Sequence, residues 1–319
     1  MIDWGKHVVT HKMMVDARDI LYSTFVNYFY RFLFIKKPKY DKKYNISICG
    51  IFKNEAPFLK EWIEYHEMIG VEHFWLYNNN STDNFNQILK PYVQRGLVTL
   101  INWPYDQGQM KAYRDFFDKY RQETQWYSFL DIDEFFVPRY ETNLLDWLKK
   151  SGLDQYPALS IFYRMFGTSG HLNHDYNKLV IEQYSITWDG LCSYGKCLIN
   201  SDYEIQVFNG GTHHFTLLRT NKMGFNFGMR PLSIYKKVVL PNRGTIRHTD
   251  SDKYASLQIN HYWSKAWDAY DKKRKMTDVF FNKNPKEDIN FFLEKEHHNI
   301  SSDFTITRFI TQLKLKLKK

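Results

Sequence analysis

Four short apolar runs alternate with helical segments between Ile46 and Leu130, and this alternation restricts the possible folds more than any other feature of the chain. A short apolar run indicates a buried strand, and apolar residues three or four positions apart indicate one face of a helix. The predicted strands cover residues 46–52, 71–77, 97–101 and 126–130. The predicted helices cover 58–69, a segment through Ile88, Leu89 and Val93 that ends near Gly96, and 111–121. Short connections between such elements are typical of a parallel sheet covered by helices, so we predict a Rossmann-like α/β fold.

Polar residues follow three of these strands at the point where each strand ends. Asn54 and Glu55 follow the first strand, the loop from Asn78 to Asp83 follows the second, and Asp131 to Glu134 follow the fourth. In a parallel α/β sheet the ligand binds beyond the carboxyl ends of the strands. We therefore expect the three clusters to form one site.

The motif Asp131-Ile132-Asp133 comes directly after the apolar pair Phe129-Leu130. Neighbouring carboxylates repel each other unless a cation or a proton relieves the repulsion. Mg²⁺ and Mn²⁺ prefer oxygen ligands and often bind through a few carboxylates together with substrate phosphates. An acidic motif of this kind is common in loops, but its position at a strand end favours a site for Mn²⁺ or Mg²⁺ on Asp131 and Asp133.

The net charge of the chain favours anionic partners without choosing among them. Lys and Arg number 44 against 35 Asp and Glu, which gives a formal charge of +9. The basic residues are scattered and no nucleic-acid reader motif is present, so we predict no nucleic-acid partner. A P-loop and a histidine-rich two-metal cluster are also absent from the sequence, which disfavours a nucleotidyltransferase or a phosphodiesterase.

The second half of the chain is less regular. Residues 158–162 predict a strand, 268–275 a helix, and 181–188 and 196–208 are strand-like or irregular. The strict alternation of 313–319 predicts either an edge strand or a basic tail at a membrane. We expect an aromatic and basic segment over 1–44, a main domain over 45–275, and a helical, basic extension over 276–319.

The ends of the chain bear on its location. The aromatic stretch from Ile20 to Ile35, followed by lysines, predicts either a helix packed on the domain or a segment on an anionic membrane surface. We see no apolar signal region with a cleavage site, and three cysteines give no disulfide framework. The sequence thus predicts a cytoplasmic protein with possible peripheral contact at the inner face of the plasma membrane.

Several motifs together resemble a known enzyme family. In order along the chain, they are Asn54-Glu55, Glu61-Trp62-Ile63-Glu64-Tyr65-His66, Gly70-Val71-Glu72-His73-Phe74, Tyr77-Asn78-Asn79-Asn80-Ser81-Thr82-Asp83 and Asp131-Ile132-Asp133-Glu134-Phe135. Over residues 46–275 the chain resembles glycosyltransferase family 92 and related family-2-like enzymes. That resemblance implies a GT-A fold, inversion at the sugar, and a UDP-sugar donor that is often UDP-galactose.

The resemblance also assigns roles to the polar clusters. Asn54, Glu55, Asn78 and Asp83 would contact the uracil and ribose of the donor, and Asp131 and Asp133 would hold the metal on its diphosphate. The alternative for the loop from Asn78 to Asp83 is a helix-capping turn without a ligand.

Two further parts of the site come from the second half of the chain. By the same resemblance, His261 would bind the metal and Lys265 the diphosphate, with His213 and His214 as competitors for the metal. The loop from Phe166 to His171 matches a family-like segment and would line a sugar pocket. An inverting transfer needs a general base, and among Asp175, Glu182 and Asp189 we choose Asp189, which lies between Trp188 and Gly190.

The sequence as a whole predicts a metal-dependent inverting glycosyltransferase. It would transfer a hexose from a UDP-sugar to a glycan or lipid-linked saccharide, in surface polysaccharide or lipopolysaccharide assembly. Galactose is the first candidate for that hexose. A different metal enzyme acting on phosphates, or a nucleic-acid-binding protein, is the alternative.

Overall fold

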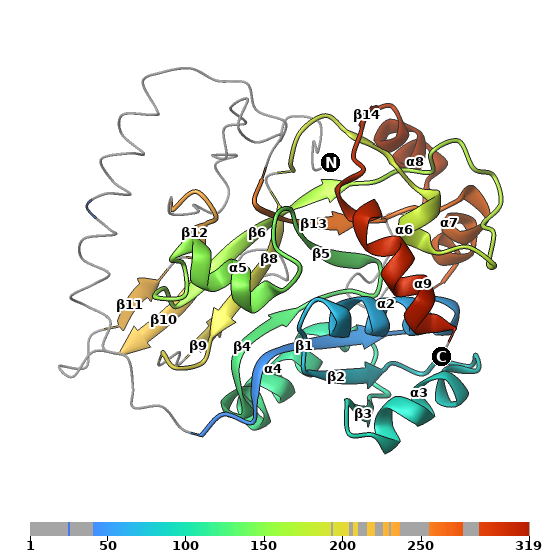
Figure 1. Ribbon diagram of the computed structural model, residues 1–319. Helices are drawn as coiled ribbons and strands as arrows, with labels where there is room; N and C mark the ends of the chain where they lie inside the picture. The colour runs from blue at the N-terminus through green and yellow to red at the C-terminus, as the bar shows by residue number, and fades with distance from the viewer. Residues whose placement is uncertain are drawn as a thin grey trace.

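A mixed sheet with helices on both faces forms the centre of the molecule (Figure 1). The computed structural model describes residue 25 and residues 41–192, 194–203, 207–209, 216–220, 226–229, 231–236, 255–276 and 287–318. The sheet has nine strands, eight of them in the order β3-β2-β1-β4-β8-β6-β13-β5, with β12 beside β6. The predicted α/β fold is confirmed.

The parallel half of the sheet comes from the first part of the chain. Its elements are β1 (Tyr44–Phe52), α2 (Ala56–Met68), β2 (His73–Asn78), α3 (Phe85–Gln94), β3 (Val98–Asn102), α4 (Gln109–Lys119), η2 (Arg121–Glu123) and β4 (Thr124–Phe129). β1 pairs in parallel with β2 and β4, and β2 pairs in parallel with β3. The predicted strands and helices all occur, with ends that differ by a few residues.

The other half of the sheet is mixed and contains strands from distant parts of the chain. Its strands are β5 (Glu134–Pro138), β6 (Ala158–Met165), β8 (Gly195–Asn200), β12 (Leu232–Ser233) and β13 (Leu257–His261). β8 runs antiparallel to both β4 and β6, whereas β13 runs parallel to β6 and antiparallel to β5. The register of β13 sets His261 opposite Glu134, at the start of β5. This pairing places His261, which comes late in the chain, next to the turn that follows β4.

The remaining elements surround this sheet. They are α5 (Leu144–Ser151), α6 (Val180–Gln183), β7 (Ile186–Trp188), β9 (Val207–Asn209), β10 (Thr216–Thr220), β11 (Asn226–Met229), α7 (Trp267–Arg274), α8 (Ile289–Glu296), β14 (Asn299–Ser302), η5 (Thr305–Phe309) and α9 (Ile310–Leu317). The strand at 158–162 and the helix at 268–275 are confirmed. The segment 181–188 contains a short helix before its strand.

The C-terminal segment is a helix, so the prediction of an edge strand there is wrong. Leu313 is fully buried and Leu317 packs against the core, while Leu315 is 60% exposed. Leu313 and Leu317 are four residues apart, a spacing that fits one helix face as well as it fits alternation. Lys316 pairs with Glu64 and Glu67 of α2. The basic residues of α9 therefore contact the domain, beside α2 in Figure 1.

The two faces of the parallel strands bury separate apolar clusters. Ile46 and Phe74 belong to the cluster under α2 and α3, whereas Trp75 and Tyr127 belong to the cluster under α4. Alternate residues of a strand point to opposite faces, so strands buried on both sides are apolar at nearly every position. Cys49, Cys192 and Cys197 are all buried.

Within the described part of the chain, no helix is both long and apolar enough to cross a membrane. The predicted amphipathic segment at 20–35 lies outside the described residues, apart from residue 25.

A buried histidine gives the fold a defined response to acid. His66 lies on α2 with Nδ1 2.8 Å from the carbonyl oxygen of Trp62, and the backbone N–H of Phe136 donates to its Nε2 at 3.3 Å. Burial lowers the pKa of His66 from 6.5 to about 3. The native protein therefore keeps this ring neutral at pH values where the unfolded chain takes up a proton.

We expect His66 alone to remove about 2 kcal/mol of unfolding free energy between about pH 7.5 and about pH 5, because only the unfolded state is protonated in that range. This stability is present above the unfolded pKa of 6.5 and is lost as the pH falls toward the folded pKa. Urea denaturation of the wild type and of His66→Gln at both pH values measures the effect. Equal losses in the two proteins would contradict it.

Candidate metal and nucleotide site

Three carboxylates lie in the turn that joins β4 to β5. The backbone N–H of Glu134 donates to the carbonyl of Asp131 at 3.1 Å, and the N–H of Asp131 donates to Oε2 of Glu134 at 3.1 Å. The N–H of Tyr262 donates to the carbonyl of Asp133 at 2.8 Å, and the indole N–H of Trp62 donates to that of Glu134 at 2.8 Å. Hydrogen bonds from α2 and from the residue after β13 therefore hold this turn in place.

Asp133, Glu134 and His261 each offer one ligand atom, and these atoms lie within 4.8 Å of one another. Nε2 of His261 is 3.6 Å from Oδ1 of Asp133. Burial lowers the pKa of His261 to about 4, so the ring is neutral near pH 7, the form that binds metals. Its Nδ1 is buried without a hydrogen-bond partner among the described residues. Two carboxylates and an imidazole fit Mn²⁺ well, so these residues fit a divalent metal ion.

Asp131, the first residue of the predicted metal motif, faces a different set of partners. Its Oδ2 is 3.1 Å from Nζ of Lys196, and Gln109 and Tyr113 each donate to its Oδ1 at 3.3 Å. The three-residue group above contains Glu134 in its place. Asp131 thus lies beside the candidate metal position, and its role as a ligand stays a prediction.

Three lysines neutralise the carboxylates. Lys196 is fully buried in β8, 3.6 Å from Glu134, and Nζ of Lys273 lies 2.6 Å from Oδ2 of Asp133. Lys265, the predicted diphosphate ligand, is buried with its Nζ 4.0 Å from Glu55 and 4.3 Å from the ring centroid of Phe58.

Sequence reasoning missed two of these lysines. Lys196 interrupts an otherwise apolar strand, and a lone charge in a buried strand is a usable signal because it requires a buried partner. Lys273 lies in a run of charged residues, where nothing distinguishes it from its neighbours on the surface.

Burial and the neighbouring cations together shift the pKa values of Glu134 and Asp133 in opposite directions. Burial raises the pKa of Glu134 to about 8, although Lys196 opposes the change. Burial also disfavours the charged form of Asp133, but Lys273, His261 and Lys265 outweigh it and lower its pKa far below the usual range. Asp133 is therefore ionised at neutral pH, and metal binding at Glu134 would release a proton.

The predicted nucleoside residues Asn54 and Glu55 lie between β1 and α2. Asn54 has a positive φ of 56°, its N–H donates to Oγ of Ser81 at 3.0 Å, and its Oδ1 accepts from the N–H of Thr82 at 2.7 Å. Glu55 turns toward the lysines, with Oε1 3.7 Å from Nζ of Lys273. The loops after β1 and β2 thus meet at one edge, as expected from the parallel sheet.

The other two nucleoside candidates hold backbone groups in this structure. Oδ2 of Asp83 accepts from the N–H of Ala56 at 2.9 Å, and Oδ1 accepts from the N–H of Phe85 at 3.4 Å. Oδ1 of Asn78 accepts from the N–H of Ser81 at 3.0 Å. These bonds tie the loop to itself and to the start of α2, whereas Asn84, the N-cap of α3, makes no side-chain capping bond. Both the capping alternative and the nucleoside role of Asn78 and Asp83 therefore remain predictions.

Asp189, the predicted general base, is exposed directly after β7. Burial lowers the pKa of Arg164, and the nearby carboxylates of Asp303 and Asp189 oppose that change. Arg164 follows Tyr163, whose hydroxyl donates to Glu134 at 2.7 Å, and successive strand residues point to opposite faces. The role of Asp189 as the general base stays a prediction. His213 and His214 lie outside the described residues.

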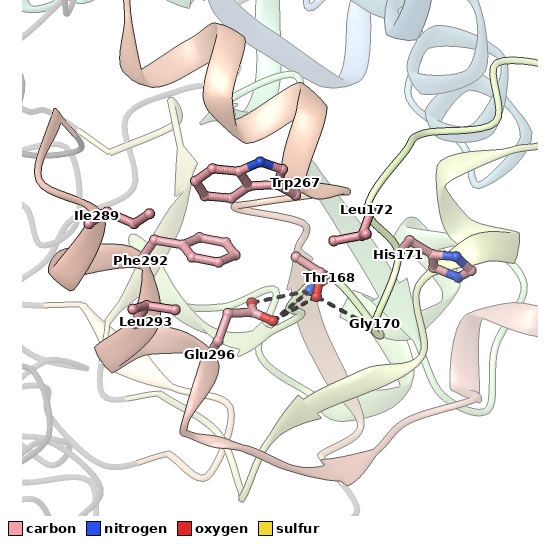
Figure 2. A pocket seen from close by; sticks show the side chains of 9 residues that line it. All are labelled: Thr168, Gly170, His171, Leu172, Trp267, Ile289, Phe292, Leu293 and Glu296. Carbon is pink, nitrogen blue, oxygen red and sulfur yellow. Dashed lines mark hydrogen bonds between the residues drawn. The ribbon is translucent and has the colours of Figure 1, made fainter.

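A pocket of about 390 Å³ lies beside the loop from Phe166 to His171. Thr168, Gly170, His171, Leu172, Trp267, Ile289, Phe292, Leu293 and Glu296 line it (Figure 2). Oγ1 of Thr168 donates to Glu296 at 2.7 Å, and the N–H of Trp267 donates to the carbonyl of His171 at 3.1 Å. The pocket and the carboxylate cluster share α7, which contributes Trp267 to one and Lys273 to the other.

Comparisons with known proteins agree with this picture. The model of glycosyltransferase family 92 matches residues 42–292. A glycosyltransferase family 92 protein of Ricinus communis is 27% identical over 237 residues, which is 73% of this chain and 38% of the relative. The galactan beta-1,4-galactosyltransferase GALS3 of Arabidopsis thaliana is 34% identical over 118 residues, 33% of this chain and 23% of the relative.

Among solved structures, S. aureus TarS (residues 1–349) is similar at 14% identity and a TM-score of 0.32, covering 44% of this chain and 40% of TarS. The chain spans about two fifths or less of the length of the two plant relatives.

Proposed function

Because the chain belongs to glycosyltransferase family 92, we propose that it transfers a hexose, galactose first, from a UDP-sugar to a saccharide or glycolipid acceptor. We further propose that the transfer inverts the sugar and requires Mn²⁺ or Mg²⁺. The observation that carries the proposal is the cluster of Asp133, Glu134 and His261 at the carboxyl end of the parallel strands, with lysines around it. Carboxylates and imidazole suit the metal, and ammonium groups suit a diphosphate.

A bound metal would act as a Lewis acid on the diphosphate of the donor. Asp133 and His261 would hold it, with Glu134 or Asp131 as a further ligand. Lys265 and Lys273 would offset negative charge on the departing UDP, and the buried position of Lys265 strengthens that effect because little water screens it. Asp189 is our candidate for the base that takes the proton of the acceptor hydroxyl.

Thermal denaturation with nucleoside diphosphates tests the donor site. UDP should raise the melting temperature only when Mn²⁺ is present, because a ligand that binds the native state stabilises it by mass action. GDP and ADP serve as controls for base preference. Absence of a shift with every nucleotide, with and without metal, would contradict the proposed function, and a UDP-sugar hydrolysis screen would follow a positive result.

We propose that the pocket beside α7 holds part of the acceptor. Ligand pockets of this size are mostly apolar, with a few polar groups that orient the ligand, and this pocket combines the rings of Trp267 and Phe292 with Thr168 and Glu296. The two rings contact each other edge to face, with centroids 4.9 Å apart. An aromatic wall gives a sugar ring or an apolar aglycone a flat contact surface.

Trp267→Ala should raise KM for the acceptor by about fivefold to thirtyfold while KM for the UDP-sugar changes less than about twofold, because a lost aromatic contact costs about 1–2 kcal/mol. Steady-state kinetics with each substrate varied in turn measures this. Tyr105→Ala, a change at an exposed aromatic residue outside the pocket, is the control. A rise in KM for the UDP-sugar alone would show that the pocket binds the donor and not the acceptor.

We propose polysaccharide synthesis as the biological setting of this enzyme, because one relative is a galactan galactosyltransferase. Both relatives named above are plant proteins, so the lipopolysaccharide prediction gains no support from them.

A further inference from the structure

Lys273 is the cationic side chain in closest contact with the candidate metal ligands. Its Nζ lies 2.6 Å from Oδ2 of Asp133 and 3.7 Å from Oε1 of Glu55. The carboxylate of Asp133 is only 5% exposed, whereas the side chain of Lys273 is 29% exposed. The buried acid therefore takes its charge compensation from a lysine that reaches the site from the solvent side.

A metal ion at Asp133 would compete with this lysine. Two cations on one carboxylate repel each other strongly in a site with little water. Lys273 has a flexible four-carbon stem and partial exposure, so it can leave its position without unfolding α7. Lys196 differs in this respect, because it is completely buried between Asp131 and Glu134.

Resting on the proposed function, we propose that Lys273 is an internal counter-ion that occupies the cation position at Asp133 and is displaced by the metal and the UDP donor together. On displacement the ammonium group moves from Asp133 to an oxygen of the diphosphate. Glu55, 3.7 Å away, provides a second acceptor along this path.

This exchange couples the two ligands. Metal alone displaces Lys273 from Asp133 and leaves it with Glu55, a carboxylate that it already contacts, so the lysine gains no new partner and the metal binds weakly. The diphosphate offers that partner, so UDP strengthens metal binding, and by linkage the metal strengthens UDP binding by the same factor. The protein would thus keep its metal mainly when the donor is present.

Titration of free Mn²⁺ by electron paramagnetic resonance tests the exchange without any measurement of activity. Without UDP, Lys273→Met should bind Mn²⁺ about tenfold more tightly than the wild type, because the competing cation is gone. With saturating UDP, the wild type should gain affinity for Mn²⁺ and Lys273→Met should gain much less. Lys272→Met, an exposed neighbour on the same helix, should behave as the wild type.

The outcomes separate this inference from the proposed function. Failure of the wild type to bind Mn²⁺ even with UDP contradicts the donor site itself. Wild-type binding of both ligands, with Lys273→Met equal to Lys272→Met, overturns the exchange and leaves the function standing. Weaker Mn²⁺ binding and a lower melting temperature in Lys273→Met would show a merely structural ion pair and also overturn it.

A second measurement covers the case in which Lys273→Met fails to fold. In ¹⁵N-labelled wild-type protein, the Nζ resonance of Lys273, assigned with Lys273→Arg, should move when Mg²⁺ and UDP are added together. Mg²⁺ alone should move it less. An unchanged resonance under both conditions would show that the lysine stays on Asp133, contrary to the exchange.

Discussion

Asp133→Asn should lower kcat/KM for the UDP-sugar by about a thousandfold or more, which corresponds to about 4 kcal/mol of lost transition-state stabilisation. Asp133 contacts both His261, a candidate metal ligand, and Lys273, a candidate diphosphate ligand. The lysines and the histidine lower its pKa far below the usual range, so it carries full negative charge at neutral pH. An amide of the same shape has no charge and binds a hard divalent ion poorly.

Initial-rate kinetics with Mn²⁺ varied over a wide range measures this effect. Asp154→Asn, a change at a half-buried acid that contacts its neighbour Gln155 away from the site, is the matched control and should retain full activity. Melting temperatures of both variants show that each is folded. An Asp133→Asn enzyme within about tenfold of the wild type would remove Asp133 from the catalytic site.

Lys196→Met should lower the free energy of unfolding by about 3–5 kcal/mol, because removal of one partner leaves buried charge without compensation. Lys196 is completely buried on β8, and its ammonium lies 3.1 Å from Asp131 and 3.6 Å from the equally buried Glu134. Asp131 and Glu134 raise the pKa of Lys196 against the effect of burial, so it stays protonated in the folded protein.

Urea denaturation compares this variant with Lys119→Met, which removes an exposed lysine paired with Asp115 and should leave the free energy of unfolding almost unchanged. The double variant Lys196→Met, Asp131→Asn should recover part of the loss, since it removes a charge on each side of the pair. A cost below about 1 kcal/mol for Lys196→Met alone would show that the ion pair contributes little to stability.

The acidic and amide residues at the strand ends were predictable because the information is local. Short apolar runs identify the buried strands, apolar residues three or four positions apart identify the helices, and Asp131 and Asp133 follow a strand within a few positions. The distant partner His261 was named from a family resemblance and not from spacing. The periodicity failed at Leu313 to Leu317, where alternation fits a strand and a helix face equally.

The sequence by itself determined the parallel α/β half and the position of the acidic motif. Tertiary structure decided which charges meet there. The register of β13 against β5 brings His261 to Glu134, β8 brings Lys196 to Asp131, and α7 brings Lys273 to Asp133. Pairing between residues some 65 to 140 positions apart leaves no local pattern that identifies the partner, because even where a lysine stands out in an apolar strand, the residues around it do not show which carboxylate it meets.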